Sequence, residues 1–278
     1  MSAALTERVN ERWWQRFFDD DFAQLWLSDD DPVEREGRTH GLVRLLDLRA
    51  GSRLFDQCCG VGRVAAPLVE RGVNVAGVDG AEPYVLHARA RCEALSAAAR
   101  GDFHYEHADA FTYVPPQPCD AAINWYTSFG YADDDAANGA MLRCAHDALR
   151  PGGLFALDYP DMERVRERFL PRSERRRVTP RGTFVAVRDA ALDERRQMLV
   201  DRWTFVDPSG ETRVRHGETR LYSRTDLQRL LSGAGFEVLR EVACDEVGYP
   251  TGAGRSIWLA RRPASSGWRA PGLRDVPR

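Results

Sequence analysis

The stretch Leu54–Arg63 constrains the fold of this chain more than any other part of the sequence. It reads as an apolar strand, a loop containing Gly60 and Gly62, and the start of a helix. Because glycine has no Cβ, such a loop can turn tightly and approach a ligand closely. Asp79 follows a second apolar run about twenty residues later, where nucleotide-binding α/β folds hold ribose hydroxyls. The sequence therefore predicts an enzyme with a nucleoside cofactor.

The identity of that cofactor depends on the residues before the loop. Residues 60–65 fit the dinucleotide fingerprint G-x-G-x-x-G/A, so an NAD(P)-dependent oxidoreductase is one interpretation. Asp56 and Gln57 count against it, because they interrupt a strand that usually stays apolar up to the first glycine. An acid there repels a pyrophosphate and suits a cofactor with a positive group, such as S-adenosylmethionine. All 39 basic residues are arginine, which also excludes reductases that depend on a Tyr–Lys pair.

Four stretches resemble motifs of the class I S-adenosylmethionine-dependent methyltransferases. Residues 55–62 match the glycine loop, with Cys58 where many members have its first glycine. Residues 77–79 match the ribose-binding acid, residues 108–110 the acidic turn that holds adenine, and residues 149–158 the turn into the fifth strand.

Within that class, the chain is most similar to a subgroup that methylates small molecules, including natural-product N-, O- and C-methyltransferases. The patterns at Cys58–Arg63 and Thr127–Tyr131 carry this likeness, and the resemblance covers roughly residues 36–262. It implies S-adenosylmethionine as the methyl donor and leaves the acceptor open.

The resemblance also implies a set of donor-binding residues. Arg38 is expected at the carboxylate of the methionine moiety, since bidentate geometry favours arginine there; an exposed helix arginine is the alternative. For Trp125, core packing is the alternative. The full implied set is Arg38, Asp56, Cys58, Gly60, Gly62, Asp79, Gly80, Asp109, Ala110, Asn124 and Trp125.

Composition narrows the partners. A net charge of −3 and a pI of about 6.1 supply no basic field for nucleic acid. No apolar run approaches the ~18 residues of a membrane span, and the N-terminus lacks the apolar core of a signal peptide. None of the six cysteines has Cys-x-x-Cys spacing. We expect a cytoplasmic protein with a small-molecule partner and no metal, nucleic acid or membrane.

The core is predicted to be an α/β doubly wound, Rossmann-like sheet of seven strands. Apolar runs alternate with helical segments, which is typical of parallel sheets covered on both faces. The resemblance adds an antiparallel last strand and the order 3-2-1-4-5-7-6. Strands are expected at 53–57, 73–78, 103–107, 119–125, 153–158, 236–242 and 255–261, and helices at 62–71, 81–99, 134–149 and 224–233.

Two additions flank this core. Residues 1–50 are expected to form a helical cap with a second helix at Glu34–Asp47. The aromatic rings of this cap serve either as a lid over the acceptor pocket or as packing against the body. Residues 161–222 are expected to open with an arginine-rich helix, Glu163–Arg177, and to continue as an antiparallel β cap or a homodimer surface. The predicted division is 1–50, 51–160, 161–222, 223–262 and a loose tail at 263–278.

Methyl transfer from a sulfonium is an in-line displacement, so the protein mainly positions the acceptor and excludes water. Where the acceptor must lose a proton, the general-base candidates are Tyr126, Asp158 and Tyr159 near the ends of the fourth and fifth strands, and His216 in the cap. A methyltransferase-like protein that binds without turnover is a further interpretation. The predicted acceptor-binding residues are Trp14, Phe18, Phe22, Tyr126, Tyr159 and His216.

Overall fold

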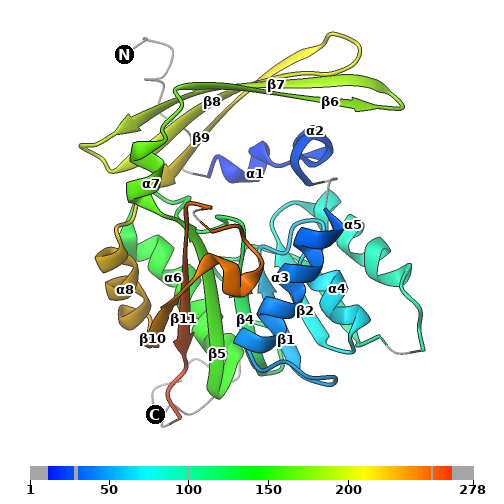
Figure 1. Ribbon diagram of the computed structural model, residues 1–278, viewed down its shortest axis with the longest axis vertical. Helices are drawn as coiled ribbons and strands as arrows, with labels where there is room; N and C mark the ends of the chain where they lie inside the picture. The colour runs from blue at the N-terminus through cyan, green and yellow to red at the C-terminus, as the bar shows by residue number, and fades with distance from the viewer. Residues whose placement is uncertain (1–11, 28–30, 99, 252, 265–278) are drawn as a thin grey trace, which may run out of the picture.

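The structure is a computed structural model that describes residues 12–27, 31–98, 100–251 and 253–264. It has two stacked parts: an α/β core and, above it, a four-stranded antiparallel sheet that we call the roof (Figure 1). Residues 265–278 of the predicted tail lie outside the described residues. Within the described residues, no helix combines the length and apolarity needed to cross a bilayer.

The core sheet has the order β3-β2-β1-β4-β5-β11-β10, which confirms the predicted order 3-2-1-4-5-7-6. β11 runs antiparallel to both β5 and β10, and the other neighbours are parallel. The strands are β1 (Arg53–Gln57), β2 (Asn74–Asp79), β3 (Phe103–His107), β4 (Cys119–Asn124), β5 (Leu149–Pro160), β10 (Glu237–Val242) and β11 (Arg255–Arg261).

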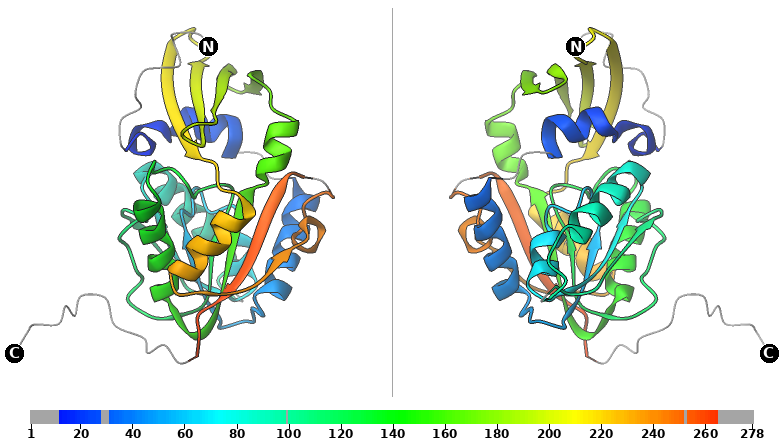
Figure 2. Two further views of the ribbon diagram at one scale, coloured as in Figure 1. Left: turned by 90° about the vertical axis from the view of Figure 1, so that its left-hand side faces the viewer. Right: turned by 90° about the vertical axis from the view of Figure 1, so that its right-hand side faces the viewer.

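Alternation along the strands places apolar side chains on both faces of the core sheet. Leu54 packs in one apolar cluster and its neighbour Phe55 in the other, because successive strand residues point to opposite faces. Helices cover each face (Figure 2). They are α3 (Pro32–Leu45), α4 (Ala65–Glu70) and α5 (Glu82–Glu93) on one face, and α6 (Asp135–Ala148) and α8 (Arg224–Gly233) on the other.

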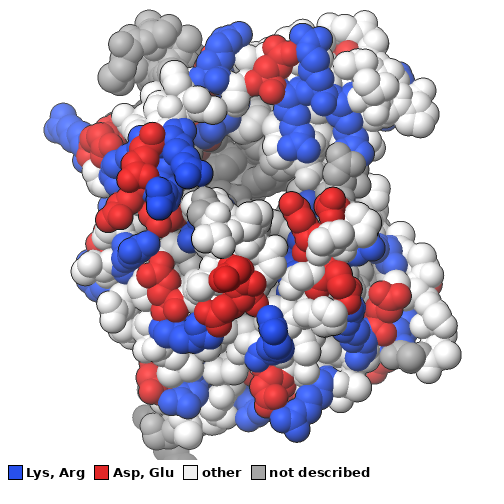
Figure 3. All heavy atoms as spheres, in the orientation of Figure 1, with Lys and Arg blue, Asp and Glu red and all other residues white. Residues whose placement is uncertain are grey.

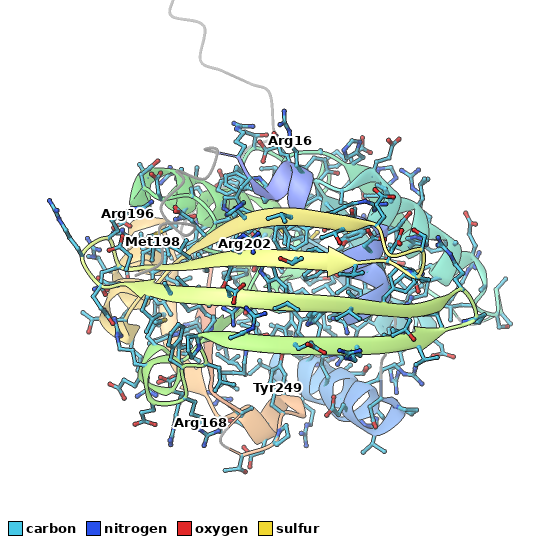
Figure 4. The ribbon with its side chains drawn as sticks, turned by 90° about the horizontal axis from the view of Figure 1, so that it is seen from above. Arg16, Arg168, Arg196, Met198, Arg202 and Tyr249 are labelled. Atoms are coloured by element: carbon cyan, nitrogen blue, oxygen red, sulfur yellow. The ribbon has the colours of Figure 1, made fainter. Side chains whose placement is uncertain are left out.

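The roof interrupts the core between β5 and α8. It consists of β6 (Arg172–Thr179), β7 (Gly182–Asp193), β8 (Met198–Val206) and β9 (Thr212–Arg220), paired in that order. Seen from above, its strands cross over the carboxyl ends of the core strands (Figure 4).

The predicted helix Glu163–Arg177 is wrong over most of its length. Only α7 (Met162–Glu167) is helical, and β6 takes the arginine-rich part. In β6, Arg175 pairs with Ala186 and Arg177 with Phe184 of β7. Ladder pairing therefore overrides the helix propensity of arginine.

The N-terminal segment, residues 12–27, lies between the core and the roof (Figure 1). It comprises α1 (Trp14–Phe17), α2 (Asp20–Phe22) and a π-helical turn at Ala23–Leu27. Leu25 packs against Phe184 and Phe205 of the roof, while Ala23 packs against Val61 and Tyr84 of the core. The segment is thus fixed to both parts.

Candidate active site

A cavity of about 550 Å³ opens at the carboxyl ends of β1, β2 and β4 and is covered by the N-terminal segment. Ligands of open α/β sheets bind at this edge of the sheet. The space-filling view shows the molecule hollowed between the roof and the core (Figure 3). Of the predicted site residues, those lining the cavity are Trp14, Phe18, Phe22, Asp56, Cys58, Gly60, Asp79, Gly80, Asp109, Ala110, Trp125 and Tyr126.

The loop after β1 turns through left-handed conformations. Cys58, Gly60 and Gly62 have φ angles of 62°, 53° and 74°, a region that favours glycine. A Cβ on Gly60 would meet no heavy atom within 4 Å, so its open side faces ligand space. A Cβ on Gly62 would lie 3.1 Å from the Cα and Cβ of Ala88. Gly62 therefore allows the loop to pack against α5, and it does not line the cavity.

Asp79 stands at the end of β2 and supports the glycine loop. Its Oδ2 accepts a hydrogen bond from the Gly60 amide at 2.8 Å, and its Oδ1 accepts one from the Ala81 amide at 2.9 Å. Burial raises the pKa of Asp79, and these two amide bonds lower it in part. The carboxylate is fixed by the backbone, with its remaining lone pairs available to ligand hydroxyls.

Asp56 is a buried carboxyl at the floor of the cavity. It is 2% exposed, and its Oδ2 has no hydrogen-bond partner among the described residues. Burial, followed by the nearby charge of Asp79, raises the pKa of Asp56 to about 7. An unpaired buried acceptor is costly unless something binds it, so the site suits a ligand that brings positive charge or a donor group.

Asn124 is held inside the sheet and does not line the cavity. Its Nδ2 donates to Gln57 Oε1 at 3.2 Å, and Gln57 Nε2 donates to the carbonyls of Ala110 and Met141. These bonds tie β4, β1 and the turn after β3 together, so the polar residues of this strand region support the turn at Asp109 and Ala110 from below.

Trp125 and Tyr126 follow β4 into the cavity. Trp125 is 2% exposed and stacks on Tyr249, with ring centroids 6.2 Å apart and planes 6° apart. Tyr126 and Thr127 are consecutive non-glycine residues in the left-handed region, with φ angles of 60° and 62°. Such strain concentrates at functional sites. The ring of Trp125 packs against Tyr249 and also lines the cavity. The packing alternative and the predicted place at the cavity therefore do not exclude each other.

Aromatic rings of the N-terminal segment cover the cavity. Trp14 stacks on Phe111 with centroids 5.2 Å apart, and Phe18 approaches Tyr131 at 5.8 Å. Phe22 stacks on Trp26 at 5.1 Å. The two alternatives for these rings, lid and packing, are again not exclusive.

Besides Gly62 and Asn124, three further predicted residues are not brought to the cavity. Arg38 is 5% exposed, which excludes the exposed-arginine alternative, and its guanidinium lies 5.4 Å from the Tyr126 ring centroid. Tyr159 is fully buried and donates its hydroxyl hydrogen bond to the Arg220 carbonyl. His216 lies on β9 opposite Arg202. The placements of Tyr159 and His216 count against a general-base role in this conformation.

Several cavity residues were not predicted. Arg63 lines the cavity, 4.6 Å from the Tyr126 ring centroid, and its signal was its place directly after the glycine loop. Tyr84 and Phe111 also line it, five residues after Asp79 and two residues after Asp109 respectively. No group of three or more metal-ligating side chains is found in the described part of the chain.

Comparison with known proteins agrees with this geometry. A sequence model described as "Methyltransferase domain" matches residues 34–241 of the chain. The chain belongs to the methyltransferase domain family. The family match and the fold confirm the predicted S-adenosylmethionine-dependent methyltransferase class.

Among curated relatives of this methyltransferase, the ubiquinone biosynthesis O-methyltransferase of Ruegeria pomeroyi is 31% identical over 172 residues. That match covers 56% of this chain and 64% of the relative. A 23S rRNA (uracil(1939)-C(5))-methyltransferase of Neisseria lactamica is 36% identical over 62 residues, covering 22% of this chain and 14% of the relative. The chain thus spans less than two thirds of the length of either relative.

Two solved structures share the fold of the methyltransferase. The CcbJ methyltransferase of Streptomyces caelestis has a TM-score of 0.67 at 19% identity, covering 83% of this chain and 90% of that one. CalS10 of Micromonospora echinaspora, an amino pentose methyltransferase solved with S-adenosylmethionine bound, has a TM-score of 0.62 at 20% identity, covering 85% and 93%.

Proposed function

We propose that this methyltransferase transfers the methyl group of S-adenosylmethionine to a small, planar or apolar acceptor. When bound, the donor supplies both the methyl group and the leaving group. The observation that carries the proposal is the composition of the cavity, which combines polar and acidic residues of the core with aromatic rings of the N-terminal segment. In this assignment the donor occupies the end formed by the glycine loop, Asp79 and Asp109.

The donor end fits the chemistry of S-adenosylmethionine. Asp79 presents acceptors for the ribose hydroxyls, and the open side of Gly60 leaves room for close approach of the ligand. Asp56 offers an unpaired carboxyl oxygen to a ligand with two positive groups and no phosphate. A dinucleotide pyrophosphate would place negative charge near Asp56, which disfavours the oxidoreductase alternative.

The aromatic end fits an acceptor that is held by stacking. Trp14, Phe18 and Phe22 supply large, rigid contact area, and planar or apolar molecules gain most from it. Burial raises the pKa of Tyr131, so its phenol stays protonated at neutral pH. We infer that the residues at this end orient the acceptor and exclude water, and that none of them is required as a base.

Secondary metabolism is part of the proposal, as is a cytoplasmic location. CalS10 is described as involved in calicheamicin biosynthesis, which supports a natural-product acceptor. A homodimer formed through the roof also stays a proposal. The short match to rRNA methyltransferases makes RNA the competing acceptor class.

The test is a methyl-transfer assay with purified full-length protein and S-adenosylmethionine, read by mass spectrometry. The acceptor panel comprises phenols, indoles, amines and amino sugars, and a 23S rRNA fragment. We expect a mass gain of one methyl group on a planar small molecule. Methylation of the RNA, or calorimetric binding of NADPH with none of S-adenosylhomocysteine, would contradict the proposal. Binding of S-adenosylhomocysteine without turnover on any acceptor would favour the non-catalytic interpretation.

Phe22→Ala then tests the division of the cavity. Phe22, the last residue of α2, lines the cavity, stacks on Trp26 and packs against the roof residues Phe184 and Phe205. We expect the acceptor KM to rise about 10-fold, because a stacking surface is lost, while S-adenosylhomocysteine affinity stays within about 2-fold of wild type. Loss of both affinities together would contradict the division.

A further inference from the structure

A buried carboxylate outside the cavity organises the strained turn at Tyr126 and Thr127. Asp158 lies near the end of β5 and is completely buried. Its Oδ2 accepts a hydrogen bond from the Tyr126 amide at 3.0 Å, and the Asp158 carbonyl accepts one from the Thr127 amide at 3.4 Å. The backbone of the left-handed pair is therefore bonded to one residue of the neighbouring strand.

Two further residues complete this arrangement from the end of the chain. The Tyr249 hydroxyl donates to Asp158 Oδ2 at 2.7 Å, and Arg255 Nε donates to Asp158 Oδ1 at 2.6 Å. One terminal nitrogen of Arg255 also donates to Thr127 Oγ1 at 2.8 Å. We call Asp158, Tyr249 and Arg255 the turn network.

The turn network has the electrostatic composition that a buried carboxylate requires. Asp158 is charge-paired by Arg255 and also accepts from a phenol and an amide, so its burial is compensated. Burial raises the pKa of Tyr249, so its hydroxyl remains a donor at neutral pH. Both carboxylate oxygens of Asp158 already accept hydrogen bonds, and Asp158 does not line the cavity. This excludes Asp158 as the general base.

Tyr249 also reaches the cavity wall by stacking. Its ring lies parallel to that of Trp125, the residue before the strained turn. In the view from above, Tyr249 sits on the connection before β11, beside α3 (Figure 4).

The connection before β11 packs closely against α3, and glycines of both elements make the close contact possible. A Cβ on Gly41 of α3 would lie 2.4 Å from Val247 Cα, and a Cβ on Gly248 would lie 2.3 Å from the Arg38 amide nitrogen. Such approach leaves no freedom for the segment to shift along the helix.

We propose that Asp158, Tyr249 and Arg255 are positioning residues for the methyl-transfer site. They hold Trp125 and Tyr126 against the cavity by fixing a left-handed turn that the sequence would not adopt alone. Thr127 is β-branched, and β-branched residues in this region are genuine outliers that surrounding contacts must enforce. The inference rests on the proposed function, since it assigns the network to the same cavity.

The primary test is Tyr249→Phe, which removes the hydroxyl and keeps the ring that stacks on Trp125. We expect kcat/KM to fall about 10-fold, because one hydrogen bond to a charged group is lost from a site whose geometry controls the rate. The matched control is Tyr222→Phe. Tyr222 is also a buried phenol, bonded to Asp135 and Asn138, and it does not line the cavity.

Both variants should lose similar thermal stability, whereas only Tyr249→Phe should lose kcat/KM. Equal kcat/KM in the two variants would overturn the inference. Arg255→Lys is the second variant, because lysine keeps the charge near Asp158 and cannot span both Asp158 and Thr127. We expect the same 10-fold loss, and wild-type kcat/KM in a folded Arg255→Lys protein would also overturn it.

A rescue experiment separates the turn from general packing. Asparagine tolerates the left-handed region better than threonine, so Thr127→Asn in the Tyr249→Phe background should recover most of the lost kcat/KM. In the wild-type background the network already holds the turn and Arg255 bonds Thr127 Oγ1. The same substitution there should not raise kcat/KM, so the difference between the two backgrounds measures how residue 127 is coupled to the network. No recovery in the double variant would show that the network does not act through the turn.

Failure of this inference is distinguishable from failure of the proposed function. Wild-type protein is first titrated with S-adenosylhomocysteine by calorimetry and assayed for methyl transfer. Absence of both in the wild type contradicts the proposed function. Wild-type activity that Tyr249→Phe and Arg255→Lys leave unchanged contradicts only the role of the turn network.

Discussion

Two carboxyl groups at the carboxyl edge of the core sheet have different surroundings, and their predicted roles differ accordingly. Asp79 is bonded to two backbone amides, whereas Asp56 has one oxygen without a partner in the described structure. A carboxylate bonded to amides is fixed before the ligand arrives. A buried carboxyl group without a partner has a raised pKa, which favours its uncharged form until a positive group is bound.

Asp79→Ala should weaken binding of S-adenosylhomocysteine by roughly 1.5–3 kcal/mol, the range for hydrogen bonds to a charged group. The variant also frees the Gly60 amide, so the loop loses its anchor. Calorimetry on the folded variant measures the change. Asp102→Ala, which removes an acid just before β3, at the opposite edge of the sheet, is the control and should bind normally. Normal binding by Asp79→Ala would remove Asp79 from the donor site.

Asp56 should make the ligand-free protein less stable as pH rises. Its folded pKa of about 7 lies above the ordinary 3.8, so between these values the folded state binds more protons than the unfolded chain. The stabilisation is complete below about pH 4 and is lost as pH rises through 7, at most about 4 kcal/mol from this group. Asp56→Asn should lose less thermal stability between pH 5 and pH 8 than wild type. Identical pH profiles would contradict the raised pKa.

At the scale of elements, the two glycines of the loop after β1 have different neighbours. Gly60 faces open space, and Gly62 faces Ala88 of α5. Gly62 therefore allows the loop to pack on α5, whereas Gly60 leaves room for the ligand.

Gly62→Ala should lower the free energy of unfolding by about 2 kcal/mol or more, combining left-handed strain with a contact that α5 must give way to. Gly60→Ala adds only the strain, about 1–2 kcal/mol, and places its methyl group where the ligand approaches. We expect denaturant melts to show the larger loss for Gly62→Ala and calorimetry to show the larger loss of donor affinity for Gly60→Ala. The reverse ranking would contradict the assignment.

The elements that could be predicted from sequence are those with local signals. β1, the glycine loop and Asp79 lie within 27 consecutive residues, 53–79, and their period and punctuation are legible along the chain. β6 was missed because an exposed edge strand rich in arginine has no apolar alternation to distinguish it from a helix surface.

The turn network illustrates the rest of what the sequence could not predict. Tyr249 and Arg255 are 91 and 97 residues from Asp158, and nothing local links them. Likewise, Tyr159 and His216 have suitable chemistry, but packing directs Tyr159 to Arg220 and places His216 on the roof. Residue type suggests what a side chain can do, whereas only tertiary structure decides what it touches.

At the scale of the whole molecule, the N-terminal segment joins the core and the roof around the cavity. Arg215 of β9 pairs with Asp19 and donates to the Phe17 carbonyl at 2.9 Å. On the other side, Tyr84 of α5 donates to the Asp19 carbonyl at 2.8 Å. Removing one of these attachments should loosen the cover of the cavity without unfolding the core.

Arg215→Gln should therefore increase hydrogen exchange of residues 12–27 relative to the core strands. Arg215 is largely buried and makes several contacts, so its removal should increase hydrogen exchange more than the removal of an exposed ion pair. Arg172→Gln is the control, because Arg172 pairs with Asp189 on the roof and is mostly exposed. Exchange measured by mass spectrometry should change only in Arg215→Gln. Equal exchange in both variants would show that the segment is held by other contacts.

The roof has a consequence for how copies of the protein behave in concentrated solution. Its outer strands, β6 and β9, end a sheet that is not closed, and open edges are templates for adding a strand from another molecule. Each carries several arginines and one glutamate, and the exposed arginines include Arg176 of β6 and Arg213 of β9. A second copy aligned edge to edge would bring like charges together. The arginines that made β6 resemble a helix surface in the sequence therefore also oppose the addition of strands from other copies to the edge of the roof.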